Sequence, residues 1–312
     1  MMFRKPKEAV SVVLDNGSEK FLNSLSPTEA ASFVSLKQQV TELVEKGEVV
    51  LDAETPEELC NKMLHRTLVT APKALSTDAA IKVMKHTDPA HLKLTLADVE
   101  HQLRTKTLFP VPDLKTKDNH SVFYMRPSRF NPAQTPVDDV INNLAYVLNS
   151  MLETRQNVEN GVSFIANMKG WTMQHFSIDY CFQFMYMLQG QTLPVKVNHF
   201  IILDPPVWFT KVWVVMKSVL RRDFRRKVKM IKRANLSKYM SPGYEAFLPR
   251  EVAGGLVPVS EIVEDFIDDR KVKERERARR LMEHGVAKST YTYSSAPSDT
   301  SECDLTHHSE TS

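Results

Sequence analysis

Few residues in this chain of 312 have types and spacings that enzymes use for chemistry. The clearest spacing is Cys60 followed after five residues by Arg66, the interval of the phosphate-binding loop in tyrosine phosphatases. That loop curls its backbone N–H groups around a phosphate and generally uses glycine to do so. The segment "CNKMLHR" has no glycine and follows a helix-start signal, so the sequence favours a chance spacing over a phosphatase loop.

The other chemically active residue types give weaker signals. His175, Ser177 and Asp179 lie close in the sequence, but catalytic triads are assembled in space, and no nucleophile elbow surrounds Ser177. The ten histidines include no HExxH, and the nine glycines form neither a GxGxxG nor a GxxxxGK[ST] phosphate loop. We therefore expect a protein that is not an enzyme and that has no metal and no cofactor.

The cysteines and the charge balance indicate a cytoplasmic protein without naming a partner. The three cysteines, at positions 60, 181 and 303, are too scattered for a disulfide framework or a metal-ligand spacing, which suits a reducing compartment. No apolar run has signal-peptide length or the roughly 18 residues of a membrane span. The net charge of +3 despite 41 Lys and Arg means that basic residues matter only where they cluster.

The first hundred residues contain repeated helix-start signals. "SPTE" at 26–29 and "TPEE" at 55–58 each combine a hydroxyl cap, a proline at the first helical position and a glutamate three residues after the cap. "TLAD" at 95–98 is a weaker version of the same signal. These signals predict a helical N-terminal region.

Beyond Phe109, short apolar runs alternate with helical patterns. The runs at 121–125, 161–168 and 197–204 are bounded by Pro, Gly, Asn or Asp, as buried strands are. Helical patterns at 135–156 and 177–190 lie between them. Strand, helix, strand, helix, strand predicts an α/β fold with a mostly parallel sheet and crossover helices.

Residues 207–220 predict a helix with one broad apolar face. That face holds Trp208, Phe209, Val212, Trp213, Val215, Met216, Val219 and Leu220, and the opposite arc holds Thr210, Lys211, Lys217 and Ser218. The apolar face is either ordinary core packing or the wall of a cavity for a hydrophobic ligand. Periodicity alone favours core packing.

A basic segment follows this helix directly. It contains Arg221, Arg222, Arg225, Arg226, Lys227, Lys229, Lys232 and Arg233, interrupted by a single acid, Asp223. Such a segment is a solvated face, a nucleic-acid patch or a patch for anionic lipid headgroups. Nucleic acid is least favoured because the local aromatic residues are in the apolar helix and are not interleaved with the charges as stacking platforms. A basic face beside an amphipathic helix is typical of membrane interfaces, which favours lipid.

These segments together resemble the CRAL-TRIO lipid-binding family, which includes retinaldehyde-binding, tocopherol-transfer and phosphatidylinositol-transfer proteins. The resemblance covers roughly residues 108–257. It rests on "GVSFIANMKG", "LPVKVNHFIILDPPVWFTKVWVVMKSVL", the basic segment and "FLPREVAGG", in the family's order. It implies a CRAL-TRIO-like mixed sheet with crossover helices that floors an apolar cavity, a mobile lid helix at 207–220, and a helical N-terminal domain. For this helix, the resemblance favours the cavity wall over core packing.

The resemblance implies an apolar pocket between sheet and lid. The candidate lining residues are Phe123, Met125, Phe164, Ile165, Phe184, Met185, Phe200, Ile202, Trp208, Phe209, Val212, Trp213, Met216 and Leu220. Strand residues alternate between the two faces of a sheet, so we expect about half of the strand candidates to face away from the ligand.

The resemblance also implies a headgroup site. Against the tocopherol-transfer pattern, Lys196 and Lys227 match two basic positions that contact phosphoinositide phosphates, while Asn198 and Asp223 replace two others. Val195 stands where the phosphatidylinositol-transfer proteins have a glutamate, which argues against their way of holding inositol. The candidate headgroup or membrane residues are Lys196, Arg222, Arg225, Arg226, Lys227 and Lys229.

These inferences divide the chain into four parts. Residues 1–107 form the helical N-terminal region, 108–258 the CRAL-TRIO-like lipid-binding domain, 259–285 a charged helix, and 286–312 a Ser/Thr-rich tail that we expect to be disordered. The basic signature usual in the family's leading domain is absent, so the N-terminal helices are candidates for binding a protein partner, as is the charged helix.

The expected function is non-enzymatic binding and intermembrane transfer of a hydrophobic lipid, with recognition of a phosphoinositide or an anionic membrane by the basic patch. The alternative is a lipid-responsive regulatory scaffold in which the lipid domain serves as a docking module. The only expected ligand is the lipid itself, with no cofactor and no nucleic acid. The expected location is the cytoplasm with transient peripheral membrane association.

Overall fold

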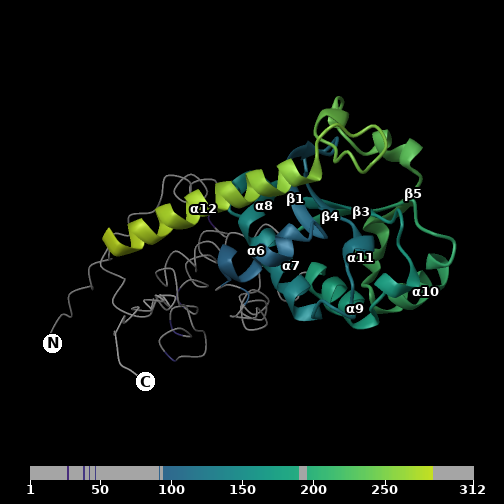
Figure 1. Ribbon diagram of the computed structural model, residues 1–312, viewed down its shortest axis with the longest axis horizontal. Helices are drawn as coiled ribbons and strands as arrows, with labels where there is room; N and C mark the ends of the chain where they lie inside the picture. The colour runs from purple at the N-terminus through teal and green to yellow at the C-terminus, as the bar shows by residue number, and fades with distance from the viewer. Residues whose placement is uncertain are drawn as a thin grey trace, which may run out of the picture.

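A five-stranded mixed sheet forms the centre of the structure, a computed structural model (Figure 1). It describes residues 94–189 and 195–283, together with the single positions 27, 38, 42, 46 and 91. Apart from those single positions, the helices predicted from the signals at 26–29 and 55–58, the Cys60–Arg66 spacing and the C-terminal tail lie outside the described residues.

The strands follow one another across the sheet in chain order. They are β1 (Leu108–Lys115), β2 (Ser121–Met125), β3 (Val162–Asn167), β4 (Val197–Leu203) and β5 (Val228–Ile231). β1 runs antiparallel to β2, and each later neighbouring pair is parallel. The mixed α/β sheet with crossover helices that the sequence predicts is therefore confirmed.

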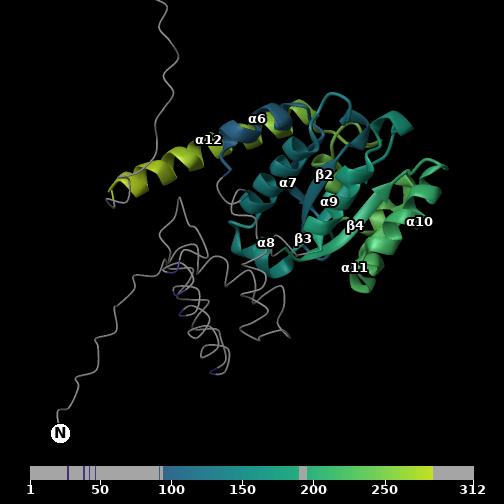
Figure 2. The same ribbon diagram turned by 90° about the horizontal axis from the view of Figure 1, so that it is seen from below.

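Helices cover one face of this sheet. They are α7 (Val137–Met151), α9 (Ile178–Leu188), α10 (Phe209–Val219) and α11 (Arg222–Lys227), and they provide the crossovers between the parallel strands. α9 lies against both α7 and α10, and α11 lies against β4. Figure 2, seen from below, shows these helices spread along that face.

The opposite face is covered by an irregular return of the chain. This segment contains the short helices η3 (Arg233–Lys238) and η4 (Tyr244–Ala246). The ring of Tyr239 lies 5.8 Å from that of His199 on β4, and Tyr124 on β2 donates a hydrogen bond to Glu251. Only one face of the sheet is therefore packed against helices that could form a lid.

Two further helices pair along the side of the domain. α6 (Leu96–Arg104) begins at the predicted "TLAD" signal, where the backbone N–H of Thr95 donates to the Asp98 carboxylate at 2.7 Å. It runs antiparallel to α12 (Val259–Glu283), with ion pairing between Arg104 and Glu264. The buried Arg270 of α12 makes a bidentate bond to Glu153, which ties the charged helix to the end of α7.

Two strands and two short α-helices, one of them α11, are absent from the sequence prediction. β1 contains Pro110 and Pro112, which an edge strand tolerates because one side of its backbone needs no ladder partner. β5 has only four residues and is flanked by basic residues, so no apolar run marks it in the sequence. The helix predicted at 135–156 ends at Met151, and a separate α8 (Arg155–Asn160) follows.

Gly161 sets the geometry where α8 meets β3. Its φ of +85° is a left-handed conformation that favours glycine, and an added Cβ would lie 2.4 Å from the carbonyl oxygen of Lys196. The strand carrying Lys196 thus approaches β3 closely at this point.

Candidate functional site

An aromatic layer fills the space between the sheet and α9. Phe123, Phe164 and Phe200 project from β2, β3 and β4 on the same face, with ring centroids 4.8 Å and 5.6 Å apart in that order. Phe184 of α9 meets the edges of Phe164 and Phe200 at 6.2 Å and 6.0 Å. All four side chains are buried, so this layer is an apolar floor beneath the helices.

The inner face of α10 closes over this region. Phe209 and Met216 are buried, and Trp208, Val212 and Trp213 are partly buried against the same core. Leu220, which ends the helix, is also buried. The predicted apolar helix is thus packed on the domain, as a closed lid would be.

The outer face of α10 carries exposed valines among polar and basic residues. Val214 is 70% exposed, Val207 just before the helix is 91% exposed, and Val215 and Val219 are about half exposed. The helical wheel placed Val215 and Val219 with the buried residues, but the structure turns them outward. The helix therefore has a buried apolar face and an outer face on which valines lie beside Lys211 and Lys217.

Two of the candidate headgroup lysines, Lys196 and Lys227, influence each other electrostatically. Burial lowers the pKa of Lys227, the Asp223 carboxylate opposes this shift, and the positive charge of Lys196 lowers the pKa further. The carbonyl of Lys196 also bonds the N–H of Val162, which fixes its strand beside β3. The structure thus places two basic residues that are distant in sequence within electrostatic range of each other.

The remaining basic candidates occupy different positions. Arg222 and Arg226 are exposed on α11, and Arg226 lies 3.8 Å from Asp223. Arg225 donates from Nε to the Leu220 carbonyl at 2.7 Å, and so secures the end of α10. Lys229 lies on β5 opposite Ile201.

The strand candidates divide by face. Met125 and Ile202 lie two residues from Phe123 and Phe200 and share their face, whereas Ile165 follows Phe164 and points to the opposite side. One of the six strand candidates therefore faces away from α9, fewer than the expected half. Met185, on α9, is buried.

Comparison with known proteins identifies this arrangement. Residues 107–251 match the CRAL/TRIO domain. This part of the chain is a CRAL/TRIO domain. The fold implies lipid binding or lipid transfer, and proteins with it generally act in this way rather than as enzymes.

More distant similarities agree with this domain. The tyrosine-protein phosphatase non-receptor type 9 of Mus musculus is 20% identical over 144 residues, which are 45% of this chain and 24% of that protein. The Homo sapiens and Rattus norvegicus proteins match to the same extent. The chain thus spans about a quarter of the length of these curated relatives.

A solved structure shares the fold. The crystal structure of Sfh5 superposes with a TM-score of 0.53 at 11% identity, over 84% of this chain and all of that one.

Trp171 is a residue of the CRAL/TRIO domain that sequence reasoning missed. It lies in the loop after β3 and stacks on Trp208 at 4.5 Å, with Phe209 edge-on at 5.6 Å. It holds the start of the lid against the domain. Because Trp171 is in a loop, no helical or strand period marked it.

Tyr180 is a second residue that sequence reasoning missed. Its ring lies between those of Phe130 and Phe184, at 4.9 Å and 5.5 Å. Its hydroxyl is buried without a hydrogen-bond partner among the described residues, and burial raises its pKa. A buried hydroxyl without a partner is unfavourable unless a ligand supplies one.

A cleft of about 550 Å³ lies elsewhere in the domain, between β1, the end of α7 and α12. Its walls are mixed, with Val111, Met151 and Phe266 beside Asp265 and Lys273. The residues that line it come from neither α9 nor α10, so it is separate from the lid. Among the helices of the described residues, none combines the length and apolar character needed to cross a bilayer.

Proposed function

We propose that this protein binds a hydrophobic lipid without converting it chemically and carries that lipid between membranes. The observation that supports this most is the double character of α10. Its inner side chains, Phe209 and Met216, are buried in the core of the domain, while Val214 and Val215 face outward. A lid that leaves the domain for a bilayer needs an apolar surface on both sides.

The energy of lipid transfer sets the requirement for the pocket. Exposing an acyl chain costs about 0.8 kcal/mol per methylene, so a chain of about 16 carbons has roughly 13 kcal/mol opposing its escape from a bilayer. The proposed pocket consists of Phe123, Met125, Phe164, Phe184, Met185, Phe200, Ile202, Trp208, Phe209, Val212, Trp213, Met216 and Leu220. The aromatic rings of this set contact one another in two groups, one between the sheet and α9 and one along α10. We expect the acyl chain to enter when α10 moves outward. The three methionines suit a pocket that adapts its shape.

The buried hydroxyl of Tyr180 supports a ligand with a polar group. A hydroxyl in an apolar layer is favourable only when it is hydrogen-bonded. A lipid alcohol, ester or carboxyl beside Phe184 would provide the missing partner.

The membrane contact combines the outer face of α10 with the basic residues next to it. Val207, Val214 and Val219 would enter the headgroup boundary, and the exposed lysines Lys211 and Lys217 would meet anionic lipids. Lys196 and Lys227 would hold a phosphoinositide phosphate, because two adjacent positive charges favour a multivalent anion. We propose a cytoplasmic protein with transient peripheral membrane association.

Mass spectrometry of organic extracts from the purified full chain tests this function, with a Trp213→Asp variant prepared in parallel. A stoichiometric lipid in the parent that is lost from the folded variant is the expected result. Equal lipid in both would contradict the pocket. No lipid in either would favour the alternative, a regulatory scaffold that docks through this domain.

A Cys60→Ser variant tests the enzymatic alternative. We expect the parent and the variant to hydrolyse p-nitrophenyl phosphate equally, at the background rate. Activity that disappears with Cys60→Ser would contradict the non-enzymatic function.

A further inference from the structure

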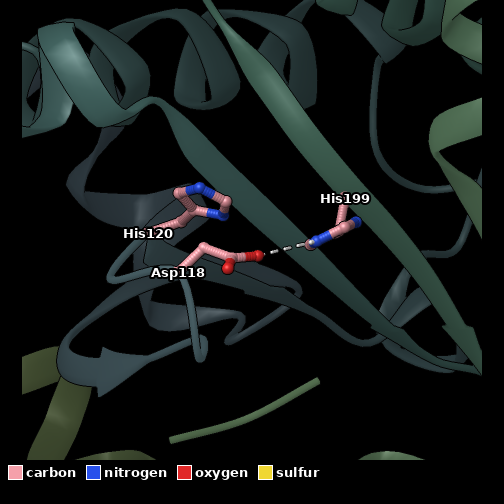
Figure 3. Close-up of side chains that lie close together, drawn as sticks. All are labelled: Asp118, His120 and His199. Atoms are coloured by element: carbon pink, nitrogen blue, oxygen red, sulfur yellow. Dashed lines mark ion pairs between the residues drawn. The ribbon is translucent and has the colours of Figure 1, made fainter. Parts of the chain in front are cut away.

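Three potential metal-binding side chains converge at the sheet end where β2 and β4 begin. Asp118 lies in the turn between β1 and β2, His120 immediately precedes β2, and His199 is on β4. One ligand atom from each lies within 4.8 Å of the others. Figure 3 shows the Asp118 carboxylate pointing toward the His199 ring.

This cluster is separate from the proposed lipid pocket. His199 pairs in register with Ser163, and the Ser163 hydroxyl lies 3.3 Å from Nδ1 of His120. Because strand residues alternate, Ser163 and His199 point to the sheet face opposite Phe164 and Phe200. The cluster therefore lies against the chain return that contains Tyr239, whose ring packs on His199.

The fold holds the three side chains in place. The N–H of Asn119 bonds the Thr116 carbonyl, and the N–H of Thr116 bonds the His120 carbonyl. The Thr116 hydroxyl accepts a further bond from the N–H of His120 at 3.1 Å. Asn119 has a φ of 61°, which closes the turn tightly. Asp118 and His120 thus come from a well-defined turn rather than from a loose loop.

Hydrogen bonds within the cluster do not explain its arrangement. Oδ2 of Asp118 lies 3.7 Å from Nε2 of His199, which is beyond hydrogen-bond distance. Nδ1 of His199 is buried and has no hydrogen-bond partner among the described residues. An ordinary structural Asp–His pair would have a shorter contact between the carboxylate oxygen and the ring nitrogen.

The spacing fits a small divalent ion. Zinc binds imidazole nitrogen and carboxylate oxygen at about 2.0–2.2 Å, so two ligand atoms in its tetrahedron lie roughly 3.3 Å apart. The separation between Asp118 and His199 is close to this distance, and the Asp118 side chain is 71% exposed and free to adjust. Two imidazoles and one carboxylate suit Zn²⁺ and leave its fourth position open to water. The positive charge of Lys196 disfavours a cation beside His120, whereas the negative charge of Asp118 favours one.

We propose that Asp118, His120 and His199 form a Zn²⁺ site that joins the β1–β2 turn to β4. The ion fixes the end of the sheet without touching the lipid pocket. The sequence carried no sign of this site because its ligands come from two distant segments with no metal-binding spacing.

Zinc stoichiometry in the tag-free full chain tests the site. The protein is stripped with EDTA, incubated with ZnSO₄, desalted and measured by plasma mass spectrometry. The parent is expected to retain one equivalent more than Asp118→Asn and His199→Gln. His101→Gln is the matched control, because His101 lies 3.4 Å from Asp139 and, among the described residues, no second histidine joins it in a metal-binding cluster.

Two further readouts distinguish this site from general histidine binding. Co²⁺ in place of zinc should give the visible absorption of a tetrahedral ion in the parent and in His101→Gln, and not in the two site variants. Zinc should also raise the melting temperature of the parent more than that of Asp118→Asn. Asp118 is on the surface, so its variant decides the result even where His199→Gln does not fold.

Equal zinc stoichiometry in the parent and Asp118→Asn would overturn the proposal, as would no retained zinc in the parent. Loss of zinc from His101→Gln to the same extent as from the site variants would also overturn it. None of these results depends on lipid binding.

Discussion

Tyr180 illustrates how a single atom can indicate a ligand. Its hydroxyl is enclosed by apolar rings and has no partner among the described residues, although its ring packs well on both sides. Packing alone would be served equally by phenylalanine. The extra oxygen is therefore better explained by binding than by folding.

Replacing Tyr180 with Phe should leave the melting temperature unchanged or slightly higher, because a buried polar group without a partner is removed. Affinity for a lipid with a polar group should fall about threefold to tenfold, the equivalent of one hydrogen bond of about 1 kcal/mol. Competition with a fluorescent lipid measures this. Tyr186→Phe, on the exposed side of α9, is the control, and an equal loss in both variants would contradict a ligand contact for Tyr180.

Lys227 shows the opposite balance, in which folding tolerates an unfavourable charge. Burial and the neighbouring Lys196 lower its pKa, and Asp223 compensates only in part. A folded-state pKa below the ordinary 10.5 means that the unfolded chain holds the proton more tightly. The stability of the folded protein should therefore rise with pH as the solution approaches 10.5.

Replacing Lys227 with Met should remove this pH dependence and should not lower stability near pH 7. Binding to anionic vesicles should weaken about fivefold, as expected for one basic residue worth about 1 kcal/mol at a membrane surface. Vesicle sedimentation and thermal melts from pH 7 to 10.5 measure the two effects. The control is Lys238→Met, an exposed lysine of η3. Vesicle binding that is unchanged in Lys227→Met would contradict a headgroup role.

At the scale of elements, the sequence predicted those with a clear period and missed those without one. The strands at β2, β3 and β4 are apolar and bounded by breakers, and α7, α9 and α10 have helical spacing. β1 contains two prolines, and β5 has only four residues among basic neighbours. The sequence predicted correctly that Phe209 and Met216 of α10 face the domain, but it placed Val215 and Val219 on the wrong side. A helical wheel identifies an apolar arc, but with valines around most of the helix it cannot tell which of them the domain covers.

The outward valines of α10 make a prediction about the lid. Val214→Asn should leave lipid retention intact but slow transfer to vesicles by roughly tenfold, because burial of a valine contributes about 1.5 kcal/mol. Transfer of a fluorescent lipid from loaded protein to acceptor vesicles gives the rate. Ser218→Asn changes another exposed position on the same helix and should have no effect. Slower transfer in both variants would point to general damage to α10 instead.

At the scale of the whole molecule, the candidate functions fall on different faces of one sheet. The helix-covered face has the aromatic layer and the lid, and the other face has the Asp118, His120 and His199 cluster. The resemblance in sequence could indicate the lipid site on the helix-covered face, because that resemblance rests on contiguous motifs. The sequence could not indicate the cluster of Asp118, His120 and His199. The register of β3 and β4 and the return of the chain decide which histidines meet.

Opening the lid depends on a contact between the loop after β3 and the start of α10. Trp171, from the loop after β3, stacks on Trp208 at the start of α10, so the lid cannot leave the domain without breaking this contact. Trp171→Ala should therefore speed lipid exchange about twofold to tenfold, the equivalent of about 0.5–1.5 kcal/mol for one aromatic pair. Trp171→Phe should give an intermediate rate because it keeps part of the stack.

A general loss of stability would also speed exchange, so a second variant must separate the two causes. Phe109→Leu removes an aromatic contact with Tyr124 at β1, far in the fold from α10, and should lower the melting temperature without changing the exchange rate. If both variants accelerate exchange in proportion to their loss of stability, global unfolding releases the lipid. If only Trp171→Ala accelerates it, the stacked tryptophans limit opening. The lid then moves as an element hinged on an otherwise rigid sheet, which is the behaviour that a carrier requires.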